Sequence, residues 1–211
     1  MSNLLNNTIC NGPVLSSVIS KGPPMRAVVG YKISKTNFDL TGIPVTCSKR
    51  APRLHLGLSF RLAPDEAQMY LMVTSSVMVL ATGKDVSNDA NILLHYDYDR
   101  EKEDGYPEAH LHACATSDTW TSVRRLDSEG PALEKLHLPV GPRRFRPTLE
   151  DVVDFLVTER LVEKHPNCDA ALRASRVDFH TKQLRAAVRR NPQPAVDELQ
   201  DLGYKVTSPS P

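Results

Sequence analysis

The residues best suited to chemistry lie in one short stretch, from Tyr96 to Cys114. The stretch opens with Tyr-Asp-Tyr-Asp and, after a charged loop, continues as Glu-Ala-His-Leu-His. Alternate residues of a strand point to the same face of a sheet, so His110 and His112 are expected to project together, with Cys114 next in the row. Two imidazoles with a carboxylate nearby suit either a divalent metal ion or general acid–base catalysis.

A carboxylate partner for these histidines is expected from the neighbouring strand or from the loop before His110. Asp97 lies on the preceding predicted strand, and Glu108 joins the histidine row if the second strand begins early enough. The candidate catalytic residues are His110, His112, Asp97 and Glu108. The candidate metal ligands are His110 and His112, with His95 or His137 as the third ligand.

The same histidines also fit an ordinary polar sheet face. His55 and His137 each stand between two leucines, so histidine alternating with leucine recurs in this chain. A His-x-His pair is a weak pattern without a third ligand at fixed spacing. A histidine-triad hydrolase would have histidine at position 114, a two-histidine phosphoesterase would have Thr or Ser two residues after each histidine, and a cupin would have a glycine pattern. None of these three patterns is present.

A second cluster holds three arginines around one aromatic residue, just before a predicted helix. Arg143, Arg144 and Arg146 flank Phe145. Guanidinium groups at a helix N-terminus bind phosphate through forked hydrogen bonds and can stack on bases. The segment is therefore a candidate phosphate-binding or nucleic-acid-binding site, and the alternative is a solvated linker with Phe145 in the core.

The net charge of +1 conceals two oppositely charged segments. Residues 1–61 contain eight Lys or Arg and one Asp, whereas residues 85–108 contain eight acids and two bases. Together with basic residues of the predicted C-terminal helices, the first segment predicts weak, salt-sensitive binding of RNA or DNA. The alternative is that the two segments neutralise each other on the surface.

Cysteine spacing and hydropathy indicate a reduced, cytoplasmic protein. The four cysteines form no Cys-x-x-Cys pair, so neither a zinc ribbon nor a secreted disulfide framework is expected. The first residues lack the basic and apolar regions of a signal peptide, and the longest apolar run is too short to cross a bilayer.

Hydrophobic periodicity predicts an α+β fold, with a mainly antiparallel sheet followed by about three helices. Residues 1–24 are expected to be flexible or irregular, 25–205 to form one domain, and 206–211 to be a tail. Alternation predicts strands at 27–33, 53–62, 69–80 with a bulge at Ser75–Ser76, 91–98, 109–115, 119–126 and 136–140. Helical spacing and a Thr-Leu-Glu-Asp cap predict helices at 148–164, 169–190 with a break near Asp178, and 194–202.

The order of these features resembles that of TumE-like toxins of bacterial toxin–antitoxin modules. The matching residues are Tyr96-Asp97, the Pro-Glu-Ala-His-Leu-His segment at 107–112, and Thr-Leu-Glu-Asp-Val at 148–152. They lie within about 69–161, less than half of the chain. The stretch 136–156 is also similar to actinobacterial proteins of unknown function.

The resemblance implies a cytosolic toxin or defence-type protein that acts on RNA and is controlled by a partner protein. On that basis the expected activity is cleavage of RNA or a nucleotide phosphodiester at the His-x-His site. The alternative is a non-catalytic regulatory or antitoxin-like protein that binds a protein partner through a sheet edge or the C-terminal helices.

Overall fold

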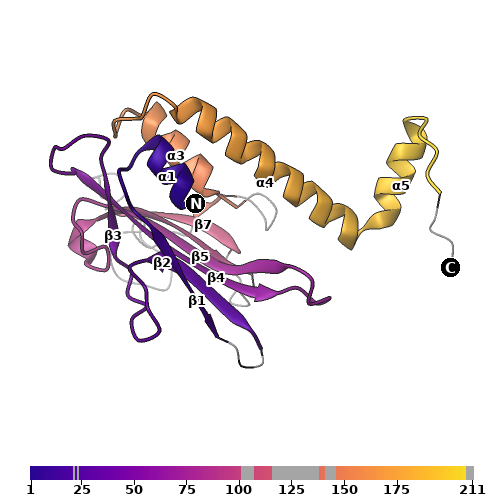
Figure 1. Cartoon of the computed structure of the whole chain (residues 1–211), viewed down its shortest axis with the longest axis horizontal. Coiled ribbons are helices and arrows are strands. Elements are labelled where there is room, and N and C mark those ends of the chain that lie inside the picture. The colour runs from indigo at the N-terminus through magenta and orange to yellow at the C-terminus, as the bar shows by residue number, and fades with distance from the viewer. Residues whose placement is uncertain (21, 23, 101–106, 116–137, 141–145, 208–211) are drawn as a thin grey trace, which may run out of the picture.

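The computed structural model describes residues 1–211 except 21, 23, 101–106, 116–137, 141–145 and 208–211. The described residues form an eight-stranded sheet with helices on one of its faces and four α-helices in all, three of which come from the C-terminal part of the chain (Figure 1). Every strand pairing is antiparallel. The predicted α+β class, with a mainly antiparallel sheet before the helices, is confirmed.

The sheet follows the chain order closely, as expected for strands joined by hairpins. The strands are β1 (Leu15–Ser20), β2 (Arg26–Tyr31), β3 (Gly42–Val45), β4 (Leu54–Pro64), β5 (Leu71–Ala81), β6 (Ile92–Asp99), β7 (Ala109–Ala113) and β8 (Leu138–Pro139). Their spatial order is β1-β2-β4-β5-β6-β7-β8, and β3 pairs with one end of β4. Strands β4 and β5 are the longest of the described strands and lie in the middle of the sheet.

Alternation along β4 sets the two faces of the sheet. Leu56, Leu58 and Phe60 are at most 5% exposed and belong to the main core. The residues that alternate with them, including Ser59 and Arg61, point to the opposite face because the side-chain period of a strand is two. One sheet face is thus apolar and covered by helices, and the other carries polar groups.

The helices on the apolar face are α1 (Ser2–Thr8), α3 (Leu149–Thr158) and α4 (Cys168–Arg190), followed by α5 (Pro192–Asp201). A capping box begins α3, because Thr148 and Asp151 each bond the backbone N–H of the other. Leu149, Val152, Val153 and Leu156 of α3 pack into the core. Figure 1 shows α4 extending beyond the sheet to α5, which stands away from it. No helix in the described residues is long and apolar enough to cross a membrane.

The N-terminal residues differ from the expectation of an irregular segment. Residues 2–8 form α1, and Leu5 and Ile9 are fully buried in the main core. Residues 15–20 form the edge strand β1, which pairs with β2 along its whole length. Because the segment is mostly polar, its sequence did not reveal that a few apolar residues pack it against the core.

Most other elements match their predicted ranges within a few residues, but α3 ends at Thr158 and does not reach the predicted end at residue 164. The register shift between β4 and β5 lies at Arg61/Leu62, opposite Ser75 and Val73, which is next to the expected bulge. Helix α4 continues without a break through Asp178. Strand β3 was not predicted, and the strand expected at 119–126 lies outside the described residues.

Candidate functional site

The pairing of β6 with β7 brings the predicted histidines and aspartate together. His95 lies opposite His112, and Asp97 lies opposite His110. Tyr96, between His95 and Asp97, packs on the helix-covered core, so the four polar side chains lie on the opposite face of the sheet. We call these four residues, His95, Asp97, His110 and His112, the His–Asp cluster.

The four side chains of the His–Asp cluster are in mutual contact. The Nδ1 of His95 lies 2.9 Å from Oδ2 of Asp97, and Nε2 of His110 lies 3.7 Å from the same oxygen. The rings of His95 and His112 stack, with centroids 4.4 Å apart and an angle of 8° between planes. His110 meets His112 edge to face, with a centroid distance of 5.1 Å. The carboxylate of Asp97 therefore contacts two imidazoles, and the ring of His112 packs against both of them.

Three members of the cluster could hold a metal ion. One ligand atom from each of His95, Asp97 and His112 lies within 4.8 Å of the others. Ligand atoms around tetrahedral zinc are about 3.3 Å apart, so modest side-chain rotation would close the group. Among the described residues, the buried Oδ1 of Asp97 has no hydrogen-bond partner. A buried, unpaired carboxylate oxygen is costly, and a bound cation would satisfy it.

Hydrogen bonds fix the protonation of two rings in the cluster. A carbonyl oxygen can only accept, so the 3.0 Å contact to the Pro107 carbonyl places the proton of His110 on Nδ1. In the neutral ring, Nε2 of His110 then presents a lone pair towards Asp97. The contact with the ionised Asp97 likewise places a proton on Nδ1 of His95. The two hydrogen bonds therefore place the proton of each neutral ring on Nδ1.

The surrounding imidazoles also control the charge of Asp97. Burial alone would raise the pKa of Asp97. The hydrogen bond from His95 and the positive charges of His95, His110 and His112 outweigh burial and lower this pKa below its ordinary value. Asp97 is therefore an anion at neutral pH, as a metal ligand or an orienting carboxylate must be.

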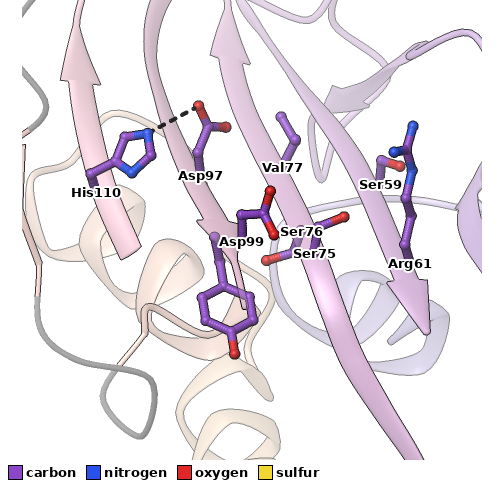
Figure 2. Close-up of a pocket in the computed structure, with 9 residues that line it drawn as sticks. Ser59, Arg61, Ser75, Ser76, Val77, Asp97, Asp99 and His110 are labelled. Carbon is purple, nitrogen blue, oxygen red and sulfur yellow. Dashed lines mark ion pairs between the residues drawn. The ribbon is translucent and has the colours of Figure 1, made fainter. Parts of the chain in front are cut away.

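A pocket of about 330 Å³ opens beside the cluster on the polar face of the sheet. Figure 2 shows Asp97, Asp99 and Arg61 rising on the same side of the strands, with His110 turned towards Asp97. The lining residues are Ser59, Arg61, Ser75, Ser76, Val77, Asp97, Tyr98, Asp99 and His110. The pocket therefore joins β4, β5, β6 and β7, which lie side by side in the sheet.

The remaining predicted site residues lie around the cluster or outside the described residues. Glu108 precedes β7, where its carbonyl accepts a hydrogen bond from the N–H of Asp99 at 2.8 Å, and it is not among the three potential metal ligands. Of the two proposed third ligands, His95 belongs to that group, and His137 lies outside the described residues. Asp97 takes the place among the potential ligands that was expected for His110.

The predicted arginine site can be described only in part. Arg143 and Arg144 lie outside the described residues. The guanidinium carbon of Arg146 lies 5.1 Å from the centroid of the Tyr98 ring, and burial lowers the pKa of Arg146. Tyr98 follows Asp97 directly and so projects to the other face of β6. The sheet therefore separates Arg146 from the His–Asp cluster.

The basic residues of α4 do not form one free cationic stripe. Arg176 contacts Asp151 and Asp154, at 3.3 and 2.8 Å. Arg189 stacks over the ring of Tyr70, with 3.9 Å between the guanidinium carbon and the ring centroid. The ion pairs of Arg176 neutralise one of the charges on which the predicted nucleic-acid binding depends, whereas Arg189 keeps its charge.

The pocket residues on β4 and β5 were not predicted as site residues. Alternation places Ser59 and Arg61 on the polar face of their strand. It does not indicate that this strand, β4, lies two positions from β6 in the sheet. The order β4-β5-β6-β7 supplies that information. No protein-family model matches the chain, and no curated protein or solved structure is significantly similar to it.

Proposed function

We propose that the protein is a metal-dependent phosphodiesterase of the toxin or defence type, which cleaves RNA at the His–Asp cluster. His95, Asp97 and His112 hold a divalent ion such as Zn²⁺. The observation that supports this proposal is the grouping of three ligand atoms within 4.8 Å around a carboxylate whose second oxygen is buried and unsatisfied. Three protein ligands leave one tetrahedral position for water or substrate, which is the pattern of catalytic zinc.

The proposed chemistry assigns separate roles to the metal ligands and to His110. A bound ion would polarise the phosphoryl oxygen and lower the pKa of bound water. His110 lies beside Asp97 with its Nδ1 proton held by Pro107. Its Nε2 accepts a proton from the attacking water or hydroxyl group and returns it to the leaving oxygen. Asp97 stabilises the imidazolium formed between these two transfers.

Zinc binding is tested by titration against a chromophoric chelator. The wild-type protein should bind one equivalent of Zn²⁺, and His112→Ala should weaken binding at least 100-fold because it removes one of three ligands. His180→Ala is the matched control, since His180 is exposed on α4. Equal zinc affinity in wild type and His112→Ala would contradict the metal site.

The RNase activity is tested separately, by cleavage of labelled RNA and by growth of a bacterial host. Zinc-loaded wild type should cleave RNA and arrest growth, and the double variant His110→Ala/His112→Ala should do neither. Zinc binding without cleavage of any phosphodiester would support the metal site and contradict the proposed enzymatic function.

A binding role is the second candidate, and it is supported by the exposed end of α4 and by α5. Val177, Leu184 and Leu202 are 66%, 67% and 64% exposed, although they are apolar. Such residues on helices that extend from the domain suit contact with a protein partner. Growth that is unaffected by either wild type or the double variant would favour this role.

A further inference from the structure

The pocket beside the His–Asp cluster has two rows of side chains that run across the strands. Pairing aligns Ser59, Val77, Asp97 and His110 in one row. It aligns Arg61, Ser75 and Asp99 in the next row. The first row ends at Asp97 and His110 of the His–Asp cluster. The second row begins at the guanidinium group of Arg61. The pocket therefore has a metal-proximal end on β6 and β7 and a cationic end on β4.

The cationic end is built to receive an anion. Arg61 is the only Lys or Arg among the described residues that line the pocket, and it is exposed. The hydroxyl groups of Ser59 and Ser75 line the same pocket. A guanidinium with neighbouring hydroxyl donors is a good match for the oxygens of a phosphate.

The anion at Arg61 is distinct from the group at the metal ligands. Strands β4 and β6 are separated by β5, which places their backbones roughly 10 Å apart. Figure 2 shows the guanidinium of Arg61 beside Ser59 and not stretched across β5 towards Asp97. A phosphate bound to a metal ion at His95, Asp97 and His112 would therefore not occupy the site at Arg61. Arg61 would then bind another part of the substrate.

The net charge of the pocket links binding of an anion at the cationic end to binding of a metal ion at the other end. Asp97 and Asp99 bring two negative charges to the pocket and Arg61 brings one positive charge. A divalent ion changes the net charge of this set from −1 to +1. A bound divalent ion therefore makes the pocket more favourable for an anion.

We propose that Arg61, Ser59 and Ser75 form an anion subsite for the phosphate next to the scissile one. The inference rests on the proposed phosphodiesterase function and narrows its substrate class. The substrate is a chain with at least two phosphates, as in an oligoribonucleotide, in preference to an isolated phosphodiester. Arg61 binds and positions this substrate and takes no part in proton transfer.

The preference is measured on RNA dinucleotides with and without a terminal phosphate at either end. Zinc-loaded wild type should show kcat/KM about 10- to 100-fold higher for one phosphorylated form, the usual range for a hydrogen-bonded ion pair. Arg61→Gln should lose that difference, so that it cleaves the phosphorylated and unphosphorylated dinucleotides with equal kcat/KM. Arg26→Gln, an exposed arginine on β2, is the control and should behave as wild type.

A direct binding measurement does not depend on metal or catalysis. Pyrophosphate is titrated into metal-free Asp99→Asn protein, in which one of the two carboxylates that line the pocket is neutral. Binding should be detected there and lost in Asp99→Asn/Arg61→Gln.

The outcomes separate the subsite from the proposed function. Absence of pyrophosphate binding by Asp99→Asn, or an equal rate loss on all dinucleotides in Arg61→Gln, overturns the subsite. Pyrophosphate binding that requires Arg61, in a protein that binds no zinc, supports the subsite and removes the metal-dependent enzyme.

Discussion

His110 and Asp97 face each other across β6 and β7, with Nε2 of His110 3.7 Å from Oδ2 of Asp97. The opposite ring nitrogen of His110 donates to the Pro107 carbonyl, and the ring is only 4% exposed. This geometry gives His110 a fixed orientation, a defined tautomer and a carboxylate partner. It lies at the edge of the metal-ligand group, which suits proton transfer better than ligation.

His110→Gln should separate catalysis from metal binding. The change removes a titratable nitrogen but keeps a polar side chain of similar size, so RNA cleavage should fall about 10²- to 10⁴-fold. Zinc affinity should fall by no more than about 10- to 100-fold, the range for a residue that contacts a ligand, because His110 is not itself one of the three ligands. The measurement is single-turnover cleavage together with zinc titration, and His95→Ala serves as the comparison that loses both properties. A loss of zinc affinity in His110→Gln equal to that of His95→Ala would contradict these roles.

The lowered pKa of Asp97 predicts a pH-dependent contribution to stability. A carboxyl group with a folded-state pKa below its unfolded value near 3.9 stabilises the fold fully above that pH. The contribution is lost as the pH falls through the lowered folded-state pKa. Wild type should therefore be more stable than Asp97→Asn above about pH 4, and the two should converge in stronger acid.

Chemical denaturation between pH 3 and pH 7 measures this difference in metal-free protein. Asp169→Asn is the control for loss of an exposed carboxylate, because Asp169 pairs with Lys164 on the surface. A constant gap between wild type and Asp97→Asn across the whole range would show that the Asp97 charge does not stabilise the fold.

The N-terminal helix should contribute substantially to stability. Leu5 of α1 is fully buried in the main core, so Leu5→Ala should lower the free energy of unfolding by about 2–5 kcal/mol. Val14→Ala, at a side chain that is 69% exposed, should change it by less than about 0.5 kcal/mol. Urea denaturation of the three proteins provides the comparison. Equal stability of Leu5→Ala and wild type would mean that α1 does not dock on the sheet in solution.

The cysteines should differ sharply in reactivity with thiol reagents. Burial, and secondarily Cys47, raises the pKa of Cys10 to about 12, and Cys168 is also buried. Cys114 is exposed. Because the thiolate is the reactive form, Cys114 should be alkylated first, and Cys10 and Cys168 only on unfolding. Mass spectrometry of the native protein after brief labelling gives the order. Early modification of Cys10 would contradict its burial.

Local pattern was sufficient to predict the sheet and most of its strands. The leucines of β4 alternate over a long run, and the cap at Thr148 identifies the start of α3. The pairing of His110 and His112 on one face follows from the same period of two. These features depend only on residues close together in the sequence.

Features that depend on distant pairing were not predictable in the same way. Arg61 and Asp99 come to line the same pocket only through the registers of β4 with β5 and of β5 with β6. The grouping of His95 and Asp97 with His112 as potential metal ligands depends on the side-chain geometry across β6 and β7. The docking of α1 depends on a few leucines within a polar segment.

The central claim is that His95, Asp97 and His112 bind a divalent metal ion. X-ray absorption spectroscopy of the protein loaded with one equivalent of Zn²⁺ tests it most directly. The account predicts a four-coordinate site with two imidazole nitrogens and oxygen ligands at about 2.0–2.1 Å, and loss of one imidazole signal in His112→Ala. A spectrum with only oxygen ligands, with sulfur ligands at about 2.3 Å, or with no change in His112→Ala would contradict it.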